Sequence, residues 1–277
     1  MKPIPTLLLA GLTPALGCAS TNAPRPGAAT PVTATAPAGE QRISWITPAG
    51  TLLRYAISVP AIPSGARVPL IVALHGRPNS QTVPPFYGAR TMEALVAPAL
   101  EPLGAVIVAP DAPRNNWTDP AAERAVLDLV ADVLDRYPVD PQRTLLMGFS
   151  MGGVGTWYLA RRHPRAFRAA LPMASFPLIR PTPINRSGLT AAWAEMDADT
   201  AGSWTLPFRE VPVYAIHSRE DDSVPFASDS ALVSRILSRG GQVEFVALDG
   251  LKHGPVSDYR PALAAAIPWI LRQWARP

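Results

Sequence analysis

The stretch Gly148-Phe149-Ser150-Met151-Gly152 places a serine between two glycines, at the junction of two segments of different character. Before it, residues 143–147 (RTLLM) form a short apolar run that predicts a buried strand. After it, residues 153–162 predict a helix that ends before Pro164. The glycines permit a sharp turn, and the helix start directs backbone N–H groups toward developing negative charge. Ser150 is therefore a candidate nucleophile.

Two later strands supply candidate partners for this serine. Residues 211–217 predict a strand whose following loop contains Asp221, and residues 242–248 predict the next strand, whose following loop contains His253. Because parallel strands end at one edge of a sheet, we expect the three side chains to converge there. A base and an acid that orients it are what a serine nucleophile requires.

These pieces resemble the α/β-hydrolase superfamily, from about residue 68 to the C-terminus. Within it the chain is similar to polyhydroxybutyrate depolymerases, feruloyl esterases and predicted-peptidase-like esterases, which are related to dienelactone hydrolases and prolyl oligopeptidases. The matching segments are Leu74-His75-Gly76, residues 139–143, residues 148–153, residues 217–225 and His253-Gly254. The resemblance implies a mostly parallel sheet with helices on both faces. It also places the triad acid three positions before Val224, at Asp221, with Ser218 in place of the usual glycine.

The resemblance also implies the roles of the site residues. His253 would act as general base for Ser150, and Asp221 would hold the imidazole in one tautomer. The oxyanion hole would use the backbone N–H of Met151 and that of Arg77, because Pro78 has no N–H to donate. The expected reaction is acyl transfer to water through an acyl-serine intermediate.

Several other residues have competing interpretations. Asp222 is a second acid in the same loop, and Asp111 follows another strand but is better suited to fixing a loop. Trp117 is interpreted either as a substrate contact or as loop packing. The remaining histidines are expected to have structural or surface roles, namely His75, His163 and His217.

The first 18 residues are typical of an export signal, with a basic start and an apolar run. The signal ends in Gly17-Cys18, and Cys18 is the only cysteine of the chain. This ending resembles a bacterial lipobox, in which the cysteine is lipidated, although Pro14 and Ala15 depart from that pattern; the alternative is a plain secretory signal. Residues 19–41 are rich in Ala, Pro and Thr and predict an extended tether. Both interpretations predict an exported protein, and the first predicts membrane anchoring in the cell envelope.

The length of 277 residues and the composition predict that residues 42–277 form one globular domain. The chain has 25 Lys plus Arg against 21 Asp plus Glu, and no run of basic residues predicts nucleic-acid binding. No metal-binding pattern is present among its 4 histidines, so no metal or cofactor is expected. In residues 42–46 and 52–58 apolar and polar side chains alternate, which predicts an antiparallel hairpin at the edge of the sheet. Residues 176–210 predict a small cap over the site.

The sequence thus predicts an exported carboxylic ester hydrolase acting on a small or oligomeric ester. Two alternatives stay open. One is a serine peptidase of the prolyl-oligopeptidase kind, for which the residues before about 68 are too few to form a gating domain. The other is a non-catalytic binding lipoprotein that retains the fold.

Overall fold

The computed structural model describes residues 38–176 and 203–277. The predicted signal, Cys18 and most of the predicted tether lie outside these residues, as does most of the predicted cap segment. Residues 36–277 form one compact unit. Its first strand begins at Gly39, so the last three residues of the predicted tether belong to the sheet.

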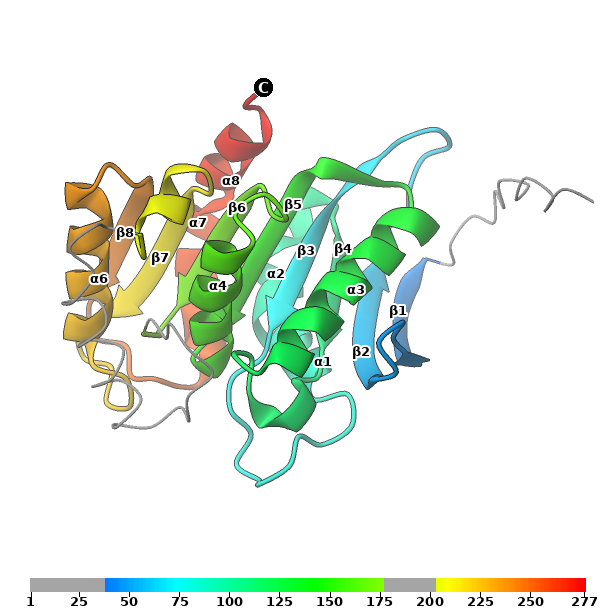
Figure 1. Cartoon of the computed structure of the whole chain (residues 1–277), viewed down its shortest axis with the longest axis horizontal. Helices are drawn as coiled ribbons and strands as arrows, with labels where there is room; N and C mark the ends of the chain where they lie inside the picture. Colours follow the sequence, from blue (N-terminus) through cyan, green and yellow to red (C-terminus); the bar gives the residue numbers. More distant parts are fainter. Residues whose placement is uncertain (1–37, 177–202) are drawn as a thin grey trace, which may run out of the picture. The chain divides into compact units, whose positions relative to one another are not determined.

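An eight-stranded sheet forms the centre of the described residues, in the order β1-β2-β4-β3-β5-β6-β7-β8 (Figure 1). Strand β2 pairs antiparallel with both of its neighbours, and every other neighbouring pair is parallel. The antiparallel hairpin predicted at one edge is therefore confirmed. The strands are β1 Gly39–Ile46, β2 Leu52–Val59, β3 Val68–Leu74, β4 Val106–Pro110, β5 Val139–Phe149, β6 Ala169–Met173, β7 Val213–Ser218 and β8 Val243–Leu248.

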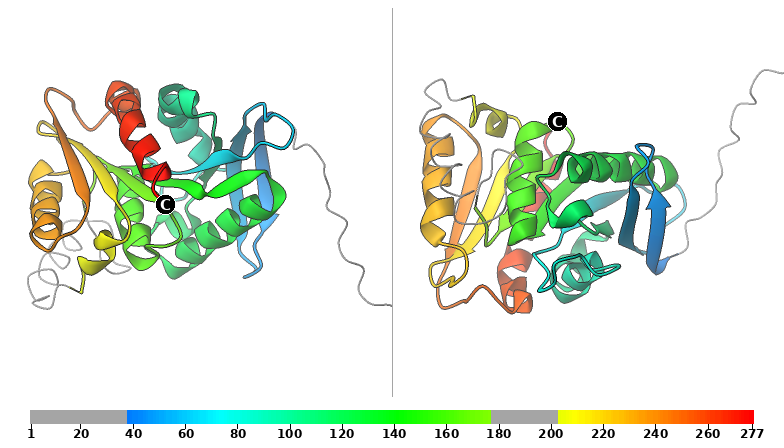
Figure 2. Two further views of the ribbon diagram at one scale, coloured as in Figure 1. Left: turned by 90° about the horizontal axis from the view of Figure 1, so that it is seen from above. Right: turned by 60° about the horizontal axis from the view of Figure 1, so that its bottom comes forward.

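Helices cover both faces of the sheet, which confirms the predicted fold class (Figures 1 and 2). One face carries α3, α4 and α6, and the other carries α2, α7 and α8. The helices are α1 Gly88–Thr91, the π-helical η1 Met92–Val96, α2 Ala97–Leu100, α3 Pro120–Arg136, α4 Met151–Arg162, α6 Phe226–Ser238, α7 Arg260–Ala265 and α8 Ile267–Trp274. Short 3₁₀ turns are η2 Glu101–Leu103, η3 Pro113–Asn115, η4 Leu206–Arg209 and η5 Val256–Tyr259.

The apolar strands explain this layering. Strand β3 and the second half of β5, residues 145–149, are nearly continuous apolar runs because both of their faces are covered, as is typical of parallel strands. Helix α3 begins at an Asp119 cap, whose Oδ1 accepts the Ala121 N–H at 2.8 Å, and its apolar stripe packs on the sheet. Trp269 and Ile270 of α8 pack on the opposite face.

The predicted site residues follow strands that end at one edge of this sheet. Strands β3, β4, β5, β7 and β8 end there, because they run in one direction. Strand β2 runs the other way, so its beginning lies at the same edge: Tyr55 is opposite Pro110, the last residue of β4. Loops at this edge therefore approach one another although they are far apart in sequence.

Candidate active site

Ser150 lies in a strained turn between β5 and α4. Its backbone has φ 57° and ψ −120°, a left-handed conformation that costs a non-glycine residue about 1–3 kcal/mol. The amide of Ser150 donates to the Met173 carbonyl at 2.9 Å, which fastens the turn to β6. Its side chain is thereby presented beyond the sheet edge, at the beginning of α4.

Two glycines make this turn sterically possible. A Cβ on Gly152 would overlap the carbonyl of Leu74 in β3, and a Cβ on Gly148 would overlap the backbone of Gly152. Both positions therefore require glycine for close backbone approach. The G-x-S-x-G pattern of the sequence thus corresponds to an actual packing constraint between β5, α4 and β3.

The structure brings Ser150, His253 and Asp221 together in one hydrogen-bonded row. The Oγ of Ser150 lies 2.7 Å from Nε2 of His253, and Nδ1 of His253 lies 2.8 Å from Oδ2 of Asp221. Asp221 has a fully buried side chain, whereas the His253 side chain is 20% exposed. With Nδ1 donating to the carboxylate, Nε2 is free to accept the proton of the serine hydroxyl.

Of the two adjacent acids, Asp221 is the one that meets the imidazole. Its Oδ1 accepts the amides of Ser223 and Val224 at 2.9 and 2.7 Å, which leaves Oδ2 directed at His253. Burial alone would raise the pKa of Asp221, but the hydrogen bonds from the two histidines and these amides hold its pKa well below the usual value. The neighbouring Asp222 is exposed, and its Oδ1 accepts the backbone amide of His253 and the hydroxyl of Ser223, both at 3.4 Å.

A buried histidine lies behind Asp221, and its environment was not foreseen from the sequence. The ring of His217, at the end of β7, is fully buried between two carboxylates. Its Nδ1 lies 2.9 Å from Asp229 on α6, and its Nε2 lies 3.5 Å from Oδ2 of Asp221 and 3.1 Å from the Val224 carbonyl. Burial acts to lower the pKa of His217, but hydrogen bonds and charge from Asp221 and Asp229 raise it to about 9.

The first turn of α4 and the loop after β3 border the Ser150 hydroxyl. Met151, whose amide is a predicted oxyanion donor, is the first residue of α4. Gly76 lies against Ser150, since a Cβ on this glycine would be 3.4 Å from the serine Cβ and 4.0 Å from Oγ. Arg77, the other predicted donor, follows Gly76 directly, so both predicted donors belong to segments adjacent to the nucleophile. Their role as an oxyanion hole stays a prediction.

His75 fixes this loop and is not a base in it. Burial lowers its pKa to about 4, so the ring is neutral. Nε2 accepts the Ala112 amide at 2.9 Å, which leaves Nδ1 to donate to the Gly76 carbonyl at 2.6 Å. The histidine therefore ties the loop after β3 to the loop after β4, in agreement with the expected structural role.

Trp117 departs from the substrate contact proposed for it. Its side chain is fully buried, and Nε1 donates to the His75 carbonyl at 2.9 Å. Its ring packs against His75 and against Gly155 of α4, where any Cβ would overlap the indole. Because its N–H is hydrogen-bonded and its ring is packed inside the protein, Trp117 stabilises the loop after β3 and does not line a surface. Plain loop packing was the alternative interpretation.

Two further residues have local structural roles. Asp111 accepts the amides of Phe86 and Gly88 at 2.7 and 2.9 Å, which orders the segment that leads into α1. His163 follows the last residue of α4, and its Nε2 lies 2.7 Å from the Glu123 carboxylate of α3. Neither contacts the row formed by Ser150.

Within residues 38–176 and 203–277, no cluster of three or more His, Cys, Asp or Glu side chains is arranged to hold a metal ion. In the same part of the chain, no helix has the length and apolar character needed to cross a bilayer.

Comparison with solved structures finds the same architecture in several hydrolases. A thermostable esterase superposes with a TM-score of 0.65 at 22% identity, covering 84% of this chain and 62% of the esterase. A ferulic acid esterase gives a TM-score of 0.65 at 19% identity, covering 86% of this chain and 100% of its own. A putative dipeptidyl aminopeptidase IV from Bacteroides ovatus gives 0.62 at 15% identity, covering 85% and 36% of the two chains. These likenesses establish the fold, since both esterases and peptidases share it.

At the level of sequence, no curated protein matches the chain. The family model described as the alpha/beta hydrolase fold, however, matches residues 69–255, a segment that contains Ser150, Asp221 and His253. The match agrees with the sheet order, with the strained turn at Ser150 and with the row of side chains beyond it. The chain therefore belongs to the α/β-hydrolase fold family.

Proposed function

We propose that this protein is a serine carboxylic ester hydrolase that acts through an acyl-serine intermediate. The observation that carries the proposal is the row Ser150–His253–Asp221, with contacts of 2.7 and 2.8 Å. A serine that is held in a strained turn with its hydroxyl against an imidazole has no evident structural use. It has the geometry that general-base activation of a nucleophile requires.

The proposed reaction begins when His253 Nε2 takes the hydroxyl proton of Ser150 and Oγ attacks the ester carbonyl carbon. The resulting oxyanion would accept hydrogen bonds from the amides of Met151 and Arg77, each of which is worth about 3 kcal/mol in the transition state. His253 then returns the proton to the leaving alcohol, and the acyl group stays on Oγ. Water, deprotonated by the same imidazole, releases the acid and restores the serine.

Asp221 supports both proton transfers. Its buried carboxylate keeps the proton of His253 on Nδ1 and stabilises the imidazolium formed at each step. The low pKa of this carboxyl keeps it ionised at neutral pH, as that role requires. Esters are favoured over peptides as substrates because the resemblances seen in the sequence are chiefly to esterases.

The testing experiment is a turnover assay on matched esters and anilides. Aryl esters from acetyl to long acyl and a feruloyl ester would be compared with aminoacyl anilides, using wild type and Ser150→Ala. We expect wild type to hydrolyse a subset of the esters and the variant to lose at least about a thousandfold in kcat/KM. Faster turnover of anilides than of esters would replace the proposal with a serine peptidase. Equal inactivity of both proteins on every substrate would favour a binding role.

We also propose that the protein is exported and that Cys18 anchors it to a membrane. The support is the signal-like start, the Gly17-Cys18 ending and the Ala/Pro/Thr-rich residues that follow.

A further inference from the structure

A buried polar network lies behind the row Ser150–His253–Asp221, and the proposed chemistry does not use it. It consists of His217 at the end of β7, Asp229 of α6 and Trp157 of α4. The side chains of His217 and Asp229 are fully buried. Well-packed apolar side chains often stabilise a core at least as well as a buried ionisable pair does, so stability alone does not explain this network.

The carbonyl of Val224 determines which nitrogen of His217 carries a hydrogen. Nε2 lies 3.1 Å from this carbonyl oxygen, and because a carbonyl can only accept, Nε2 is a donor. The same N–H faces Oδ2 of Asp221 at 3.5 Å. His217 therefore presents a donor to the loop that carries the triad acid.

This donor holds the Asp221 carboxylate by two routes. The direct route is the approach of Nε2 to Oδ2, the oxygen that also accepts from His253 at 2.8 Å. The indirect route runs through Val224, whose carbonyl accepts from His217 and whose amide donates to Oδ1 of Asp221 at 2.7 Å. Movement of the His217 ring would loosen both routes, so the ring determines where Oδ2 points.

Asp229 determines the charge of the His217 ring. Its Oδ2 lies 2.9 Å from Nδ1 of the ring, its Oδ1 accepts the Trp157 indole N–H at 3.2 Å, and its carboxylate also accepts the Ser175 amide. Two lone pairs would repel at 2.9 Å, so a proton lies between Nδ1 and Oδ2. The N–H donors of Trp157 and Ser175 favour the ionised carboxylate, which places that proton on the ring. With both nitrogens protonated, His217 is an imidazolium.

The pKa shifts agree with this arrangement. Burial acts to lower the pKa of His217, but hydrogen bonds to Asp221 and Asp229 and their charge raise it to about 9. Burial raises the pKa of Asp229, and the hydrogen bond and charge of His217 oppose that rise. The pair therefore retains its shared proton at neutral pH.

Other ionisable groups near the row are peripheral or neutral. Asp222 is exposed, and Arg219, which lies over the Phe226 ring of α6, is exposed and paired with Asp249 at 2.8 Å. Burial raises the pKa of Tyr259, so its hydroxyl is uncharged at neutral pH. Among the described residues around Asp221, the buried positive charge is thus assigned to His217.

We propose that His217 is a positioning residue for ester hydrolysis, an inference that rests on the proposed function: held by Asp229, it fixes the Asp221 carboxylate and presents a positive charge to it. Charges then alternate from Asp229 through His217 to Asp221, with His253 next in the row. The positive charge keeps the buried Asp221 carboxylate ionised and offsets part of its attraction for a proton. His253 can therefore accept the Ser150 proton at a lower pH than it could beside an unopposed carboxylate.

The test is the pH dependence of ester hydrolysis in two conservative variants. His217→Gln keeps an amide donor but cannot be charged. Asp229→Asn can keep the contacts to Trp157 and to Nδ1 but leaves the ring neutral, because an amide donates to Nδ1 where the carboxylate accepted. The profile of kcat/KM is measured from pH 5 to 9 on an aryl ester that wild type hydrolyses. Rates are referred to the sites that an aryl phosphonate labels, so misfolded protein does not enter them.

Without the positive charge, the coupled Asp221–His253 unit takes up a proton at a higher pH. We expect the acidic midpoint of the profile to rise by about half to one pH unit in both variants. At pH 8, kcat should fall about 3- to 10-fold while KM stays within about twofold, since both altered side chains are buried behind Asp221. A residue that only stabilises the fold would leave the midpoint unchanged.

His163→Gln is the matched control. Its Nε2 also lies close to a carboxylate, that of Glu123 at 2.7 Å, but it follows the opposite end of α4 from Ser150. Its acidic midpoint should agree with that of wild type. In this background at pH 8, nitrogen-15 NMR of labelled histidines should show one ring protonated on both nitrogens, a measurement that needs no change in the network itself.

The outcomes separate the two proposals. An acidic midpoint unchanged in both variants, with turnover that still depends on Ser150, would overturn the positioning role and leave the esterase proposal intact. Absence of a doubly protonated ring in the His163→Gln background would overturn it as well, even if neither network variant folds. Absence of Ser150-dependent turnover on every ester would instead overturn the proposed function, and the positioning role with it.

Discussion

At the scale of single residues, Gly152 and Gly76 lie next to Ser150 but tolerate very different changes. A methyl group on Gly152 would overlap the Leu74 carbonyl, which cannot shift because it belongs to the backbone of a central strand. We therefore expect Gly152→Ala to lower the free energy of unfolding by about 3 kcal/mol or more, the upper range of overpacking costs. Urea unfolding followed by circular dichroism measures this loss.

Gly76→Ala is the matched comparison, because its added methyl meets only ordinary contacts, 3.4 Å to the Ser150 Cβ and 3.5 Å to the Phe149 carbonyl. Stability should fall by less than about 1 kcal/mol. Ester turnover should nevertheless fall about tenfold or more, since the methyl would lie 4.0 Å from Ser150 Oγ, where the substrate carbonyl must approach. Equal loss of stability in the two variants would contradict the packing account of the turn.

At the scale of elements, His217 joins the end of β7 to α6 through Asp229 and to the triad loop through Asp221. The hydrogen bonds that the His217 ring donates to these carboxylates, together with their charge, outweigh burial and raise the pKa of His217 to about 9, above the unfolded value near 6.5. Its contribution to stability is therefore complete below about pH 6.5 and is lost as pH rises through about 9. The slope can reach about 1.4 kcal/mol per pH unit between these values.

This pH dependence is measured by urea unfolding of wild type and His217→Gln from pH 6 to 10. Glutamine keeps a donor amide at the position but cannot titrate. We expect the wild-type protein to lose stability over this interval and the variant to be less stable at pH 6 with a flatter profile. Parallel profiles would show that His217 is uncharged in the folded protein.

The sequence predicts well the strands and loops at the edge of the sheet that holds Ser150, because their signals are local. Apolar runs and G-x-S-x-G fix the strand-to-helix turn at Ser150, and the loops after two later strands hold Asp221 and His253. The choice between Asp221 and Asp222 came from family resemblance, and a spacing rule alone would not separate adjacent acids. The structure separates them by the amides of Ser223 and Val224, which orient one carboxylate.

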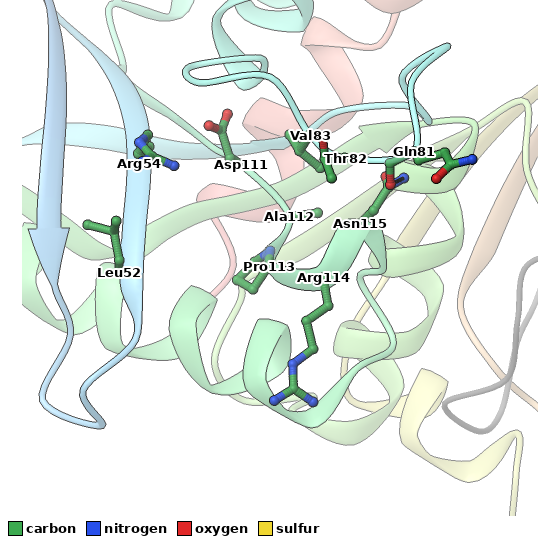
Figure 3. Close-up of a pocket in the computed structure, with 10 residues that line it drawn as sticks. All are labelled: Leu52, Arg54, Gln81, Thr82, Val83, Asp111, Ala112, Pro113, Arg114 and Asn115. Atoms are coloured by element: carbon green, nitrogen blue, oxygen red, sulfur yellow. Dashed lines mark hydrogen bonds between the residues drawn. The ribbon is translucent and has the colours of Figure 1, made fainter.

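Other features of the site depend on tertiary packing and have weak local signals. Asp229 is a single acid in an otherwise ordinary covering helix, and only the approach of α6 to β7 pairs it with His217. Trp117 follows a strand at the active edge, which suggested a substrate contact, but its indole turns inward beneath His75. Arg54 of β2 and Asn115 of the loop after β4 line one cavity of about 390 Å³ from opposite sides (Figure 3), and only the folded chain brings them to it.

At the scale of the whole molecule, we propose that the start of the chain directs the enzyme to the cell envelope. If Cys18 carries a lipid, wild type expressed in a bacterium should fractionate with the membranes, and Cys18→Ala should move to the soluble fraction. Two acyl chains, unlike one, hold a protein stably on a bilayer. Intact mass spectrometry of the membrane fraction checks the modification directly. A wild-type protein that is soluble and unmodified would favour the plain secretory signal.

The central claim is that the folded site as a whole activates Ser150 as a nucleophile. Its most direct test is intact-mass and peptide-mass analysis after treatment with an aryl phosphonate. Wild type should gain one adduct, located on Ser150, while Ser150→Ala gains none and His253→Ala reacts about a thousandfold more slowly. Absence of an adduct, or an equal rate in the His253 variant, would contradict the account.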